Sequence, residues 1–266
     1  NTPRNKVGVL DGDQFRQVIT DYYGEGSPAY NLLGTANTNW QDEILRTSVS
    51  SDYNLSVGGT YKILPYRVAV SYTNQNGILK TSAMDRVTAS ITLNPKFFDN
   101  TLNVKGFYMH NRFADEGAIG GAVSFDPSQS VRVDNLPIGN GYFTWLKPGT
   151  DEFIGIAPVN PVSLIDERSM KADVYRSVGN LQLDYVMPFL PALHANLNLG
   201  YDVSHSIQHN LMTPDSPLTY KENKKTGLGQ DERLRQLKRN LLLDFYLNYK
   251  QDFESIHSRL DAMAGY

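Results

Sequence analysis

The chain has 266 residues, a formal net charge of -3 at pH 7 and no cysteine. Its mean hydropathy of -0.40 and the lack of any apolar run near about eighteen residues exclude a helical membrane protein, although transmembrane strands would pass this test. Without cysteine there can be no disulfide, thiolate metal site or cysteine nucleophile. The weak negative charge offers no broad basic surface for nucleic acid.

The start of the chain resembles neither a signal peptide nor an initiation site. It reads Asn1-Thr2-Pro3-Arg4, without an initiator Met, a basic stretch or an apolar stretch. We therefore expect a mature form or an excised piece of a longer protein, and we favour the excised piece.

One short amphipathic helix is predicted within residues 9–23. Asp11 or Asp13 can cap its first turn and Gly24 can end it. Apolar side chains recur at close to helical spacing, at Leu10, Phe15, Val18, Ile19 and Tyr22. Residues 24–39 are rich in Gly, Ser, Pro, Asn and Thr, which predicts a loop.

Eight segments that follow alternate apolar with polar residues and are predicted to be strands. In the seventh, for example, Leu241, Leu243 and Phe245 alternate with Leu242 and Asp244. The strands are expected near 47–60, 66–74, 85–94, 101–111, 176–187, 193–206, 238–251 and 255–266. Each predicted strand therefore has one apolar and one polar face.

The charged residues in the middle of these segments fall on the polar face. The charged positions are Asp52, Arg67, Arg86, Lys105, Asp184, Asp202, Asp244, Arg259 and Asp261. A Lys or Arg facing lipid at mid-depth would cost roughly 2 to 4 kcal/mol, so a barrel wall requires this segregation. A soluble sandwich would hide its charges from the core in the same way, so segregation favours a membrane wall without deciding for it.

The connections between the predicted strands alternate in length. Short connections are expected at 62–65, 95–100, 188–192 and 252–254, and longer ones at 75–84, 112–175 and 207–237. In an antiparallel up-and-down wall, this rhythm places short turns at one rim and long loops at the other, as in bacterial outer-membrane barrels. The fold predicted is an all-β, antiparallel up-and-down transmembrane β-barrel wall.

Several stretches resemble the SusC/RagA-like family of TonB-dependent outer-membrane transporters of Bacteroidetes. They are 39–47 (NWQDEILRT), 54–59 (NLSVGG), 65–82 (PYRVAVSYTNQNGILKTS), 118–127 (AIGGAVSFDP), 160–164 (NPVSL), 179–185 (GNLQLDY) and 189–201 (FLPALHANLNLGY). Together these stretches span nearly the whole chain in a consistent order.

The resemblance implies a 22-stranded barrel with an internal plug, of which this chain would hold roughly the second to the ninth strand, without plug or TonB box. It implies a cell outer membrane location in a Gram-negative bacterium and import of glycans or peptides. It also implies a SusD-like lipoprotein lid and energy from TonB as partners, contact with outer-membrane lipid, no cofactor and no enzymatic activity.

On this basis we expect residues 1–46 to form an extracellular helix and loop segment, and residues 47–266 a partial transmembrane barrel. The side chains expected to line the lumen are Arg67, Arg86, Lys105, Asp184, Asp202, Asp244 and Arg259. Two alternatives remain open: a self-contained eight-stranded outer-membrane barrel with binding loops, favoured by the terminal aromatic Tyr266, and a soluble carbohydrate-binding β-sandwich.

The long insertion holds the candidate substrate-binding residues, in the stretch 135–145 (NLPIGNGYFTW). Aromatic rings beside Gly and Asn suit stacking on sugars or holding an extended peptide, which selects Asn135, Asn140, Tyr142, Phe143 and Trp145. The alternative is that the three aromatic rings pack the loop onto its neighbours or onto a lid partner.

Catalytic and metal sites have little support. The five histidines lack metal-ligand spacing, since His205 and His209 would need a helix where strand and loop are predicted. The glycine-rich stretch 117–122 lacks the Lys-Ser/Thr of a phosphate loop, so it predicts a close-packed helical turn folded into the lumen. The basic stretch 221–239 is expected to be a solvated loop, with contact to a partner or an anionic glycan as its other role.

Overall fold

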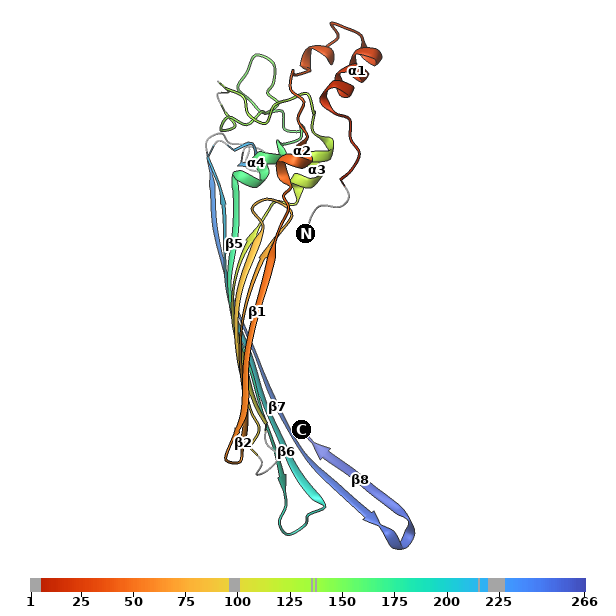
Figure 1. Cartoon of the computed structure of the whole chain (residues 1–266), viewed down its shortest axis with the longest axis vertical. Coiled ribbons are helices and arrows are strands. Elements are labelled where there is room, and N and C mark those ends of the chain that lie inside the picture. The colour runs from red at the N-terminus through yellow and green to blue at the C-terminus, as the bar shows by residue number, and fades with distance from the viewer. Residues whose placement is uncertain (1–5, 96–100, 135, 137, 215, 220–227) are drawn as a thin grey trace.

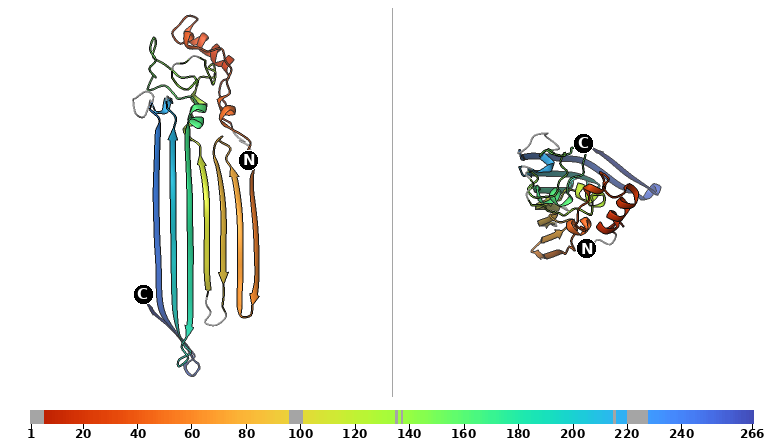
Figure 2. Two further views of the ribbon diagram at one scale, coloured as in Figure 1. Left: turned by 90° about the vertical axis from the view of Figure 1, so that its left-hand side faces the viewer. Right: turned by 90° about the horizontal axis from the view of Figure 1, so that it is seen from above.

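The computed structural model describes residues 6–95, 101–134, 136, 138–214, 216–219 and 228–266. Eight strands form one antiparallel sheet in chain order, drawn as a tall curved wall in Figures 1 and 2. The strands are β1 (Ser50–Tyr61), β2 (Leu64–Asn76), β3 (Ala83–Leu93), β4 (Thr101–Phe113), β5 (Arg168–Val186), β6 (Leu193–Met212), β7 (Gln230–Phe253) and β8 (Ser258–Gly265). The predicted up-and-down fold is confirmed.

The sheet is open. Each strand pairs with its neighbours in sequence, and among the described residues no pairing joins β1 to β8. The same residues form no second sheet packed onto the first. A closed eight-stranded barrel and a two-layer sandwich are therefore not the folds of this chain.

The connections separate onto two rims, as the sequence predicted. Figure 1 places the helices and the long β4 to β5 connection at one end of the wall, and the β1 to β2 turn at the other. The strict alternation of lengths is wrong at one place. The connection between β2 and β3 was expected to be long, but the two strands pair up to Asn76 and Ala83 and leave only residues 77–82 between them. This connection does not exceed the one at 94–100, at the opposite rim, in length.

Three strands are longer at the long-loop rim than the alternation predicted. β5 begins at Arg168, β6 ends at Met212 and β7 begins at Gln230. In β6 and β7 both faces are mixed there, and in β5 the alternation reverses, with Met170, Ala172 and Val174 on the polar face of the wall and Lys171 and Asp173 on the other. The alternation of the lower wall therefore does not extend to this rim. Backbone pairing between adjacent strands continues nonetheless, since it needs no apolar face.

The register brings most of the apolar residues of the strands to one face of the sheet. Val57 lies opposite Val68, which lies opposite Ile91, and the row continues to Val104. These side chains lie open on the surface: Leu55 is 71% and Leu241 is 85% exposed. An apolar face of this extent indicates contact with lipid or another protein. We call this face the apolar band.

The helices lie at the long-loop rim (Figure 1). They are α1 (Gly12–Tyr23), α2 (Trp40–Ile44), α3 (Gly117–Ser124) and α4 (Pro161–Asp166), with a short 3-10 turn at Tyr30–Leu32. A second 3-10 turn, at Glu254–Ile256, joins β7 to β8 at the opposite rim. The α1 start is the predicted one, because Asp11 and Gln14 form a capping box and Gly24 is the C-cap. Among the residues described, no helix is long and apolar enough to cross a membrane.

The buried core sits at the long-loop rim rather than within the wall. It joins the N-terminal segment to all three connections at that rim. We call it the rim cluster: Trp40, Ile44, Leu79, Ala114, Ala118, Ala122, Phe125, Tyr142, Val162, Leu164, Ile165, Met212 and Leu218. Helix α3 presents Ala118 and Ala122 to it and packs against α2 and α4. The predicted helical turn therefore packs into the rim cluster.

Candidate functional site

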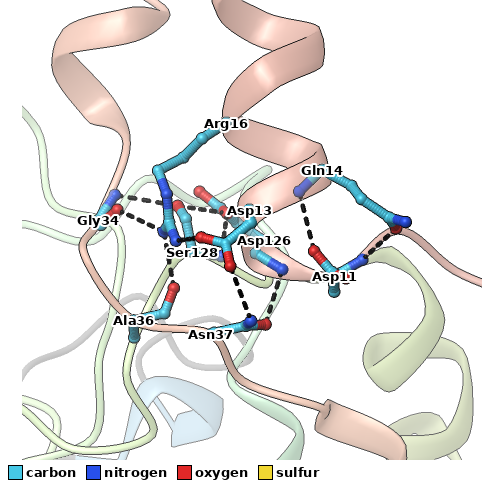
Figure 3. A network of polar contacts seen from close by, with 10 residues as sticks. Asp11, Asp13, Gln14, Arg16, Gly34, Ala36, Asn37, Asp126 and Ser128 are labelled. Atoms are coloured by element: carbon cyan, nitrogen blue, oxygen red, sulfur yellow. Dashed lines mark hydrogen bonds and ion pairs between the residues drawn. The ribbon is translucent and has the colours of Figure 1, made fainter.

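The N-terminal segment is fastened to the β4 to β5 insertion by backbone and side-chain contacts (Figure 3). Arg16 on α1 donates from Nη1 to the carbonyls of Gly34 (3.1 Å) and Ala36 (2.7 Å). The amide of Ala36 in turn donates to the Ser128 carbonyl at 2.9 Å. A Cβ on Gly34 would lie 2.2 Å from that same carbonyl oxygen, so the close approach requires glycine.

Tyr142, a predicted binding residue, lies inside the rim cluster. Its side chain is 4% exposed, and its hydroxyl donates to Asp166 Oδ2 at 2.7 Å. Arg132 donates to the same hydroxyl at 2.6 Å, and its guanidinium carbon lies 4.1 Å from the ring centroid. This ring is occupied by internal contacts, as the packing alternative supposed.

Burial raises the pKa of the Tyr142 phenol above the ordinary value of 10.0, and the hydrogen bond to Asp166 adds to the rise. An unfolded rim would lose the phenolic proton first as the pH rises through 10.0. The folded state therefore binds more protons there, and the free energy of unfolding falls as the pH rises above that value.

We expect Tyr142→Phe to lower the free energy of rim unfolding by about 1–2 kcal/mol at neutral pH, since the hydroxyl bonds are lost. At a pH above the ordinary tyrosine pKa, the difference in the free energy of unfolding between wild type and variant should become smaller. Only wild type has the Tyr142 phenol, whose titration lowers its stability in that range. Urea titrations followed by limited proteolysis of the β4 to β5 connection, at neutral and alkaline pH, measure both effects. A gap that does not narrow at alkaline pH would contradict the assignment.

Phe143 and Trp145 continue from the rim cluster toward the surface. Phe143 packs edge-on against Phe125 at 6.1 Å between centroids, and Trp145 packs edge-on against Phe143 at 4.9 Å. Both rings are half-buried. The three rings therefore run from the buried Tyr142 through Phe143 to Trp145, and Trp145 lines two surface cavities.

Two cavities meet at Trp145. The first measures about 440 Å³ and lies between the insertion, with Trp145, Phe153 and Pro158, and Pro217 of the β6 to β7 connection. The second measures about 370 Å³ and is lined by Phe15 and Ile19 of α1 as well as by the insertion. Four residues line both cavities: Trp145, Ile154, Ala157 and Pro158. We call this pair of cavities the rim groove.

The rim groove is largely apolar with one ion pair at its border. Lys147 and Glu152 line the first cavity, and Lys147 Nζ lies 2.6 Å from Glu152 Oε2. The hydrogen bond from Lys147 and its positive charge lower the pKa of Glu152, which favours the ionised carboxylate. A ligand would find an apolar surface with charge confined to one edge, which suits a partly apolar solute.

Asn140, another predicted binding residue, does not line the rim groove. Asn140 donates from Nδ2 to Glu167 Oε1 at 2.5 Å and to the Pro214 carbonyl at 2.8 Å, which ties the insertion to the β6 to β7 connection. Asn135 lies outside the described residues. Ile154, Pro158 and the α1 residues Phe15 and Ile19 line the rim groove although the sequence did not select them as binding residues. The apolar stripe of α1 was the available signal, but its partner in the groove lies more than a hundred residues away.

All seven residues predicted to line the lumen lie on one face of the sheet, opposite to the apolar band. Arg67 faces Thr92, Arg86 faces Thr73 and Lys105 faces Ser90 across their strand pairs. The others are Asp184, Asp202, Asp244 and Arg259.

Further polar contacts follow this face. Arg176 donates to Asp202 from two nitrogens, at 2.8 and 2.6 Å, and His194 Nδ1 lies 3.1 Å from Asp184 Oδ1. Asn198 donates to Asp244 at 3.3 Å. The geometry is that of a hydrated, hydrogen-bonded surface on which charges offset one another.

Comparisons with known proteins agree on one group. No family model matches the sequence. TonB-dependent receptor SusC of Bacteroides thetaiotaomicron is 36% identical over 261 residues, covering 92% of this chain and 25% of the receptor. TonB-dependent receptor P3 of Formosa agariphila is 27% identical over 277 residues, covering 98% of this chain and 25% of that protein. The chain thus spans about a quarter of the length of these curated relatives.

Solved structures show the same fold. The RagAB peptide transporter matches with a TM-score of 0.68 at 14% identity, covering 97% of this chain and 32% of that chain. The RagAB peptide importer in its closed-closed state matches with a TM-score of 0.63 at 15% identity, covering 98% and 30%. Taken with the 36% identity to SusC, this places the chain in the SusC/RagA-like family of TonB-dependent outer-membrane transporters, as part of a β-barrel wall.

Proposed function

We propose that this chain contributes about eight wall strands and a rim binding surface to a TonB-dependent importer of glycans or peptides in a Gram-negative outer membrane. The apolar band faces lipid, and the polar face with Arg67, Asp202 and Asp244 lines the substrate passage. Residues 1–46 lie on the extracellular side with the long-loop rim. No side chain has a covalent role.

The observation that carries this proposal is the continuous apolar band. Seven successive strand pairings keep apolar residues on one face and the charged residues of the mid-wall on the other. A wall between lipid and a watery passage needs such a division, because a charge at mid-depth in lipid costs roughly 2 to 4 kcal/mol. The exposure of the band in the isolated chain fits a surface that lipid covers.

The partners follow from the relatives by analogy. We propose a SusD-like lipoprotein that covers the long-loop rim, and TonB acting through parts of the protein other than this wall. The rim groove would then lie between wall and lid, where cargo first makes contact. Its apolar lining with Trp145 can stack on a sugar ring or hold an apolar peptide side chain.

Deleting the gene that encodes this chain should abolish growth of its host on one purified glycan or on a peptide mixture, while growth on glucose is unchanged. Which of the two nutrients is affected identifies the cargo class. Growth unchanged on every glycan and peptide tested would contradict the importer.

A point variant tests the rim groove separately. Complementing the deletion with Trp145→Ala should raise the nutrient concentration that supports half-maximal growth by about tenfold to a hundredfold, since a lost aromatic contact costs about 1.5–3 kcal/mol. Ile156→Ala is the matched control, because Ile156 is 95% exposed in the same loop and lines neither cavity. Equal growth of the two variants would remove Trp145 from cargo binding and leave the importer itself standing.

A further inference from the structure

A row of tyrosines crosses the face that carries the apolar band, at its border toward the long-loop rim. Tyr53 faces Tyr72 across β1 and β2, and Tyr108 faces Tyr175 across β4 and β5. Val87 on β3 lies between the two pairs, opposite both Tyr72 and Tyr108. The Tyr72 hydroxyl donates to Asp85 at 3.0 Å and the Tyr108 hydroxyl donates to Asp173 at 2.7 Å. Rings on the apolar side and hydroxyls turned to charged residues are the anatomy of a membrane interface.

Basic side chains lie beyond this row, on the same face. Arg112 faces Lys171, Lys171 faces His209, and His209 faces Arg233, so four basic residues lie side by side across β4 to β7. Because strands tilt in a barrel, the end of the apolar band toward the long-loop rim falls at a different residue level on each strand. On β7 it ends at Leu241, and the charged residues above it on this face include Arg239, Arg235 and Arg233. We call Arg112, Lys171, Arg233, Arg235 and Arg239 the basic belt.

The five cations of the basic belt outnumber the three carboxylates on the same surface, one of which, Asp85, attracts Arg112. Three carboxylates share its surface, and each has other partners: Asp85 accepts from Asn74 at 2.6 Å. Asp173 lies 2.8 Å from His110 Nδ1, and Asp231 lies 2.5 Å from His209 Nε2. Across the described part of the chain, none of the five belt residues forms an ion pair with a carboxylate. All five side chains are exposed, and the three on β7 lie along an edge where β8 pairs only with Tyr246–Phe253.

We propose that the basic belt binds the phosphate groups of a glycolipid in the outer leaflet of the outer membrane. The inference rests on the proposed membrane location. A lipid whose acyl chains cover the apolar band places its headgroup beside the tyrosine row, at the level of the basic belt. Arg is well suited to phosphate, because its planar fork can donate two parallel hydrogen bonds to phosphate oxygens.

The direction in which the basic belt points favours lipid over a protein lid. Its side chains lie on the lateral face of the wall, in continuation of the apolar band, whereas the loops and helices gather at the end of the wall (Figure 2). Cations on the passage side, such as Arg67 and Arg86, lie on the opposite face of the sheet. A lipid headgroup is the anionic partner that reaches the lateral face.

The test uses the protein that contains this chain, purified from outer membranes in detergent. The probe is diphosphoryl lipid A, with the same lipid freed of its phosphates and inorganic phosphate as two further arms. The variant carries Arg233→Gln, Arg235→Gln and Arg239→Gln. Its matched control carries Arg67→Gln, Arg86→Gln and Lys238→Gln, which removes as many positive charges from the opposite face.

We expect the belt variant to bind diphosphoryl lipid A on the order of a hundredfold more weakly than wild type, because each cation near an anionic surface contributes roughly fivefold. The control variant should bind like wild type, and the phosphate-free lipid should bind wild type as weakly as the belt variant binds lipid A. Inorganic phosphate should not displace the lipid at equal concentration.

Equal binding of lipid A to wild type, belt variant and control would overturn the proposal, and so would equal loss in both variants. Membrane insertion is measured alongside, by heat-modifiable migration of each protein taken from outer membranes. Wild type absent from that membrane would overturn the proposed location and this inference together. Wild type inserted without preference for phosphorylated lipid would overturn this inference alone. If the belt variant fails to insert, the single variant Lys171→Gln is compared with the control Lys238→Gln in the same lipid A binding assay. Weaker binding by Lys171→Gln alone supports the proposal, and equal binding by the two overturns it.

Discussion

Trp40→Ala is expected to lower the free energy of unfolding of the long-loop rim by about 3–5 kcal/mol, the range for truncating a buried Trp. The Trp40 side chain is 2% exposed, and its ring packs edge-on against Phe125 at 4.7 Å between centroids. Its indole nitrogen donates to the Asp126 carbonyl at 3.0 Å, so the variant also leaves a backbone acceptor unpaired. The rim should therefore open while the wall stays paired.

Limited proteolysis across a urea series, applied to the membrane-inserted protein, measures this loss as cleavage of the β4 to β5 connection at lower urea. Tyr22→Ala is the control, because Tyr22 is an aromatic residue of α1 that is 83% exposed. The control should stay within about 0.5 kcal/mol of wild type. If both variants were cleaved at the same urea concentration, Trp40 would not hold the rim together.

Val70→Arg is expected to destabilise the inserted wall by roughly 2 to 4 kcal/mol, because Val70 lies in the apolar band and an arginine there would face lipid. Val70 faces Leu55 on β1 and Ala89 on β3, so no acidic residue of either strand lies directly opposite to accept the new charge. The amount of protein assembled in the outer membrane should fall accordingly.

Ser71→Arg is the matched control, since Ser71 is the next residue of β2 and lies on the polar face opposite Asn54 and Thr88. Its assembly should match wild type, because the new side chain enters the hydrated passage. Two measurements compare the variants: the amount of each protein in isolated outer membranes, and the urea concentration at which each unfolds after refolding into vesicles. Greater damage from Ser71→Arg than from Val70→Arg would reverse the assignment of the two faces.

Local signals in the sequence were sufficient for the wall and for α1. A side-chain period of two identifies a strand and both of its faces, so the alternation alone predicts that Val57, Val68 and Ile91 share one face. Helix α1 has twelve residues, a capping box and an apolar stripe, and each of these can be recognised within a few residues of sequence.

Shorter elements could not be recognised in this way. Helix α2 has five residues and α4 has six, too few to show a helical period. Their capping residues, Asn39 and Asn160, are also ordinary loop residues. The upper ends of β6 and β7 carry polar residues on both faces, and the upper end of β5 has its apolar residues on the other face than the rest of the strand, so pairing with a neighbouring strand is what reveals them as a continuation of the wall.

The candidate site, too, could be predicted from the sequence only in part. The sequence selected the aromatic stretch around Trp145, but it could not separate a ring that is buried from one that reaches a cavity. That difference depends on contacts such as those of Tyr142 with Asp166 and Arg132, and on Phe15, which lines the rim groove from α1.

By itself, the sequence determined two faces, two rims and a family, because alternation, turn chemistry and motif order are properties of neighbouring residues. Only the tertiary structure decided that the sheet stays open between β1 and β8, that the three connections at the long-loop rim share one core, and that basic residues from β4 to β7 form a single belt. The physical reason is that these features join residues far apart in the chain. Their proximity is set by strand register and loop packing, and no local pattern records it.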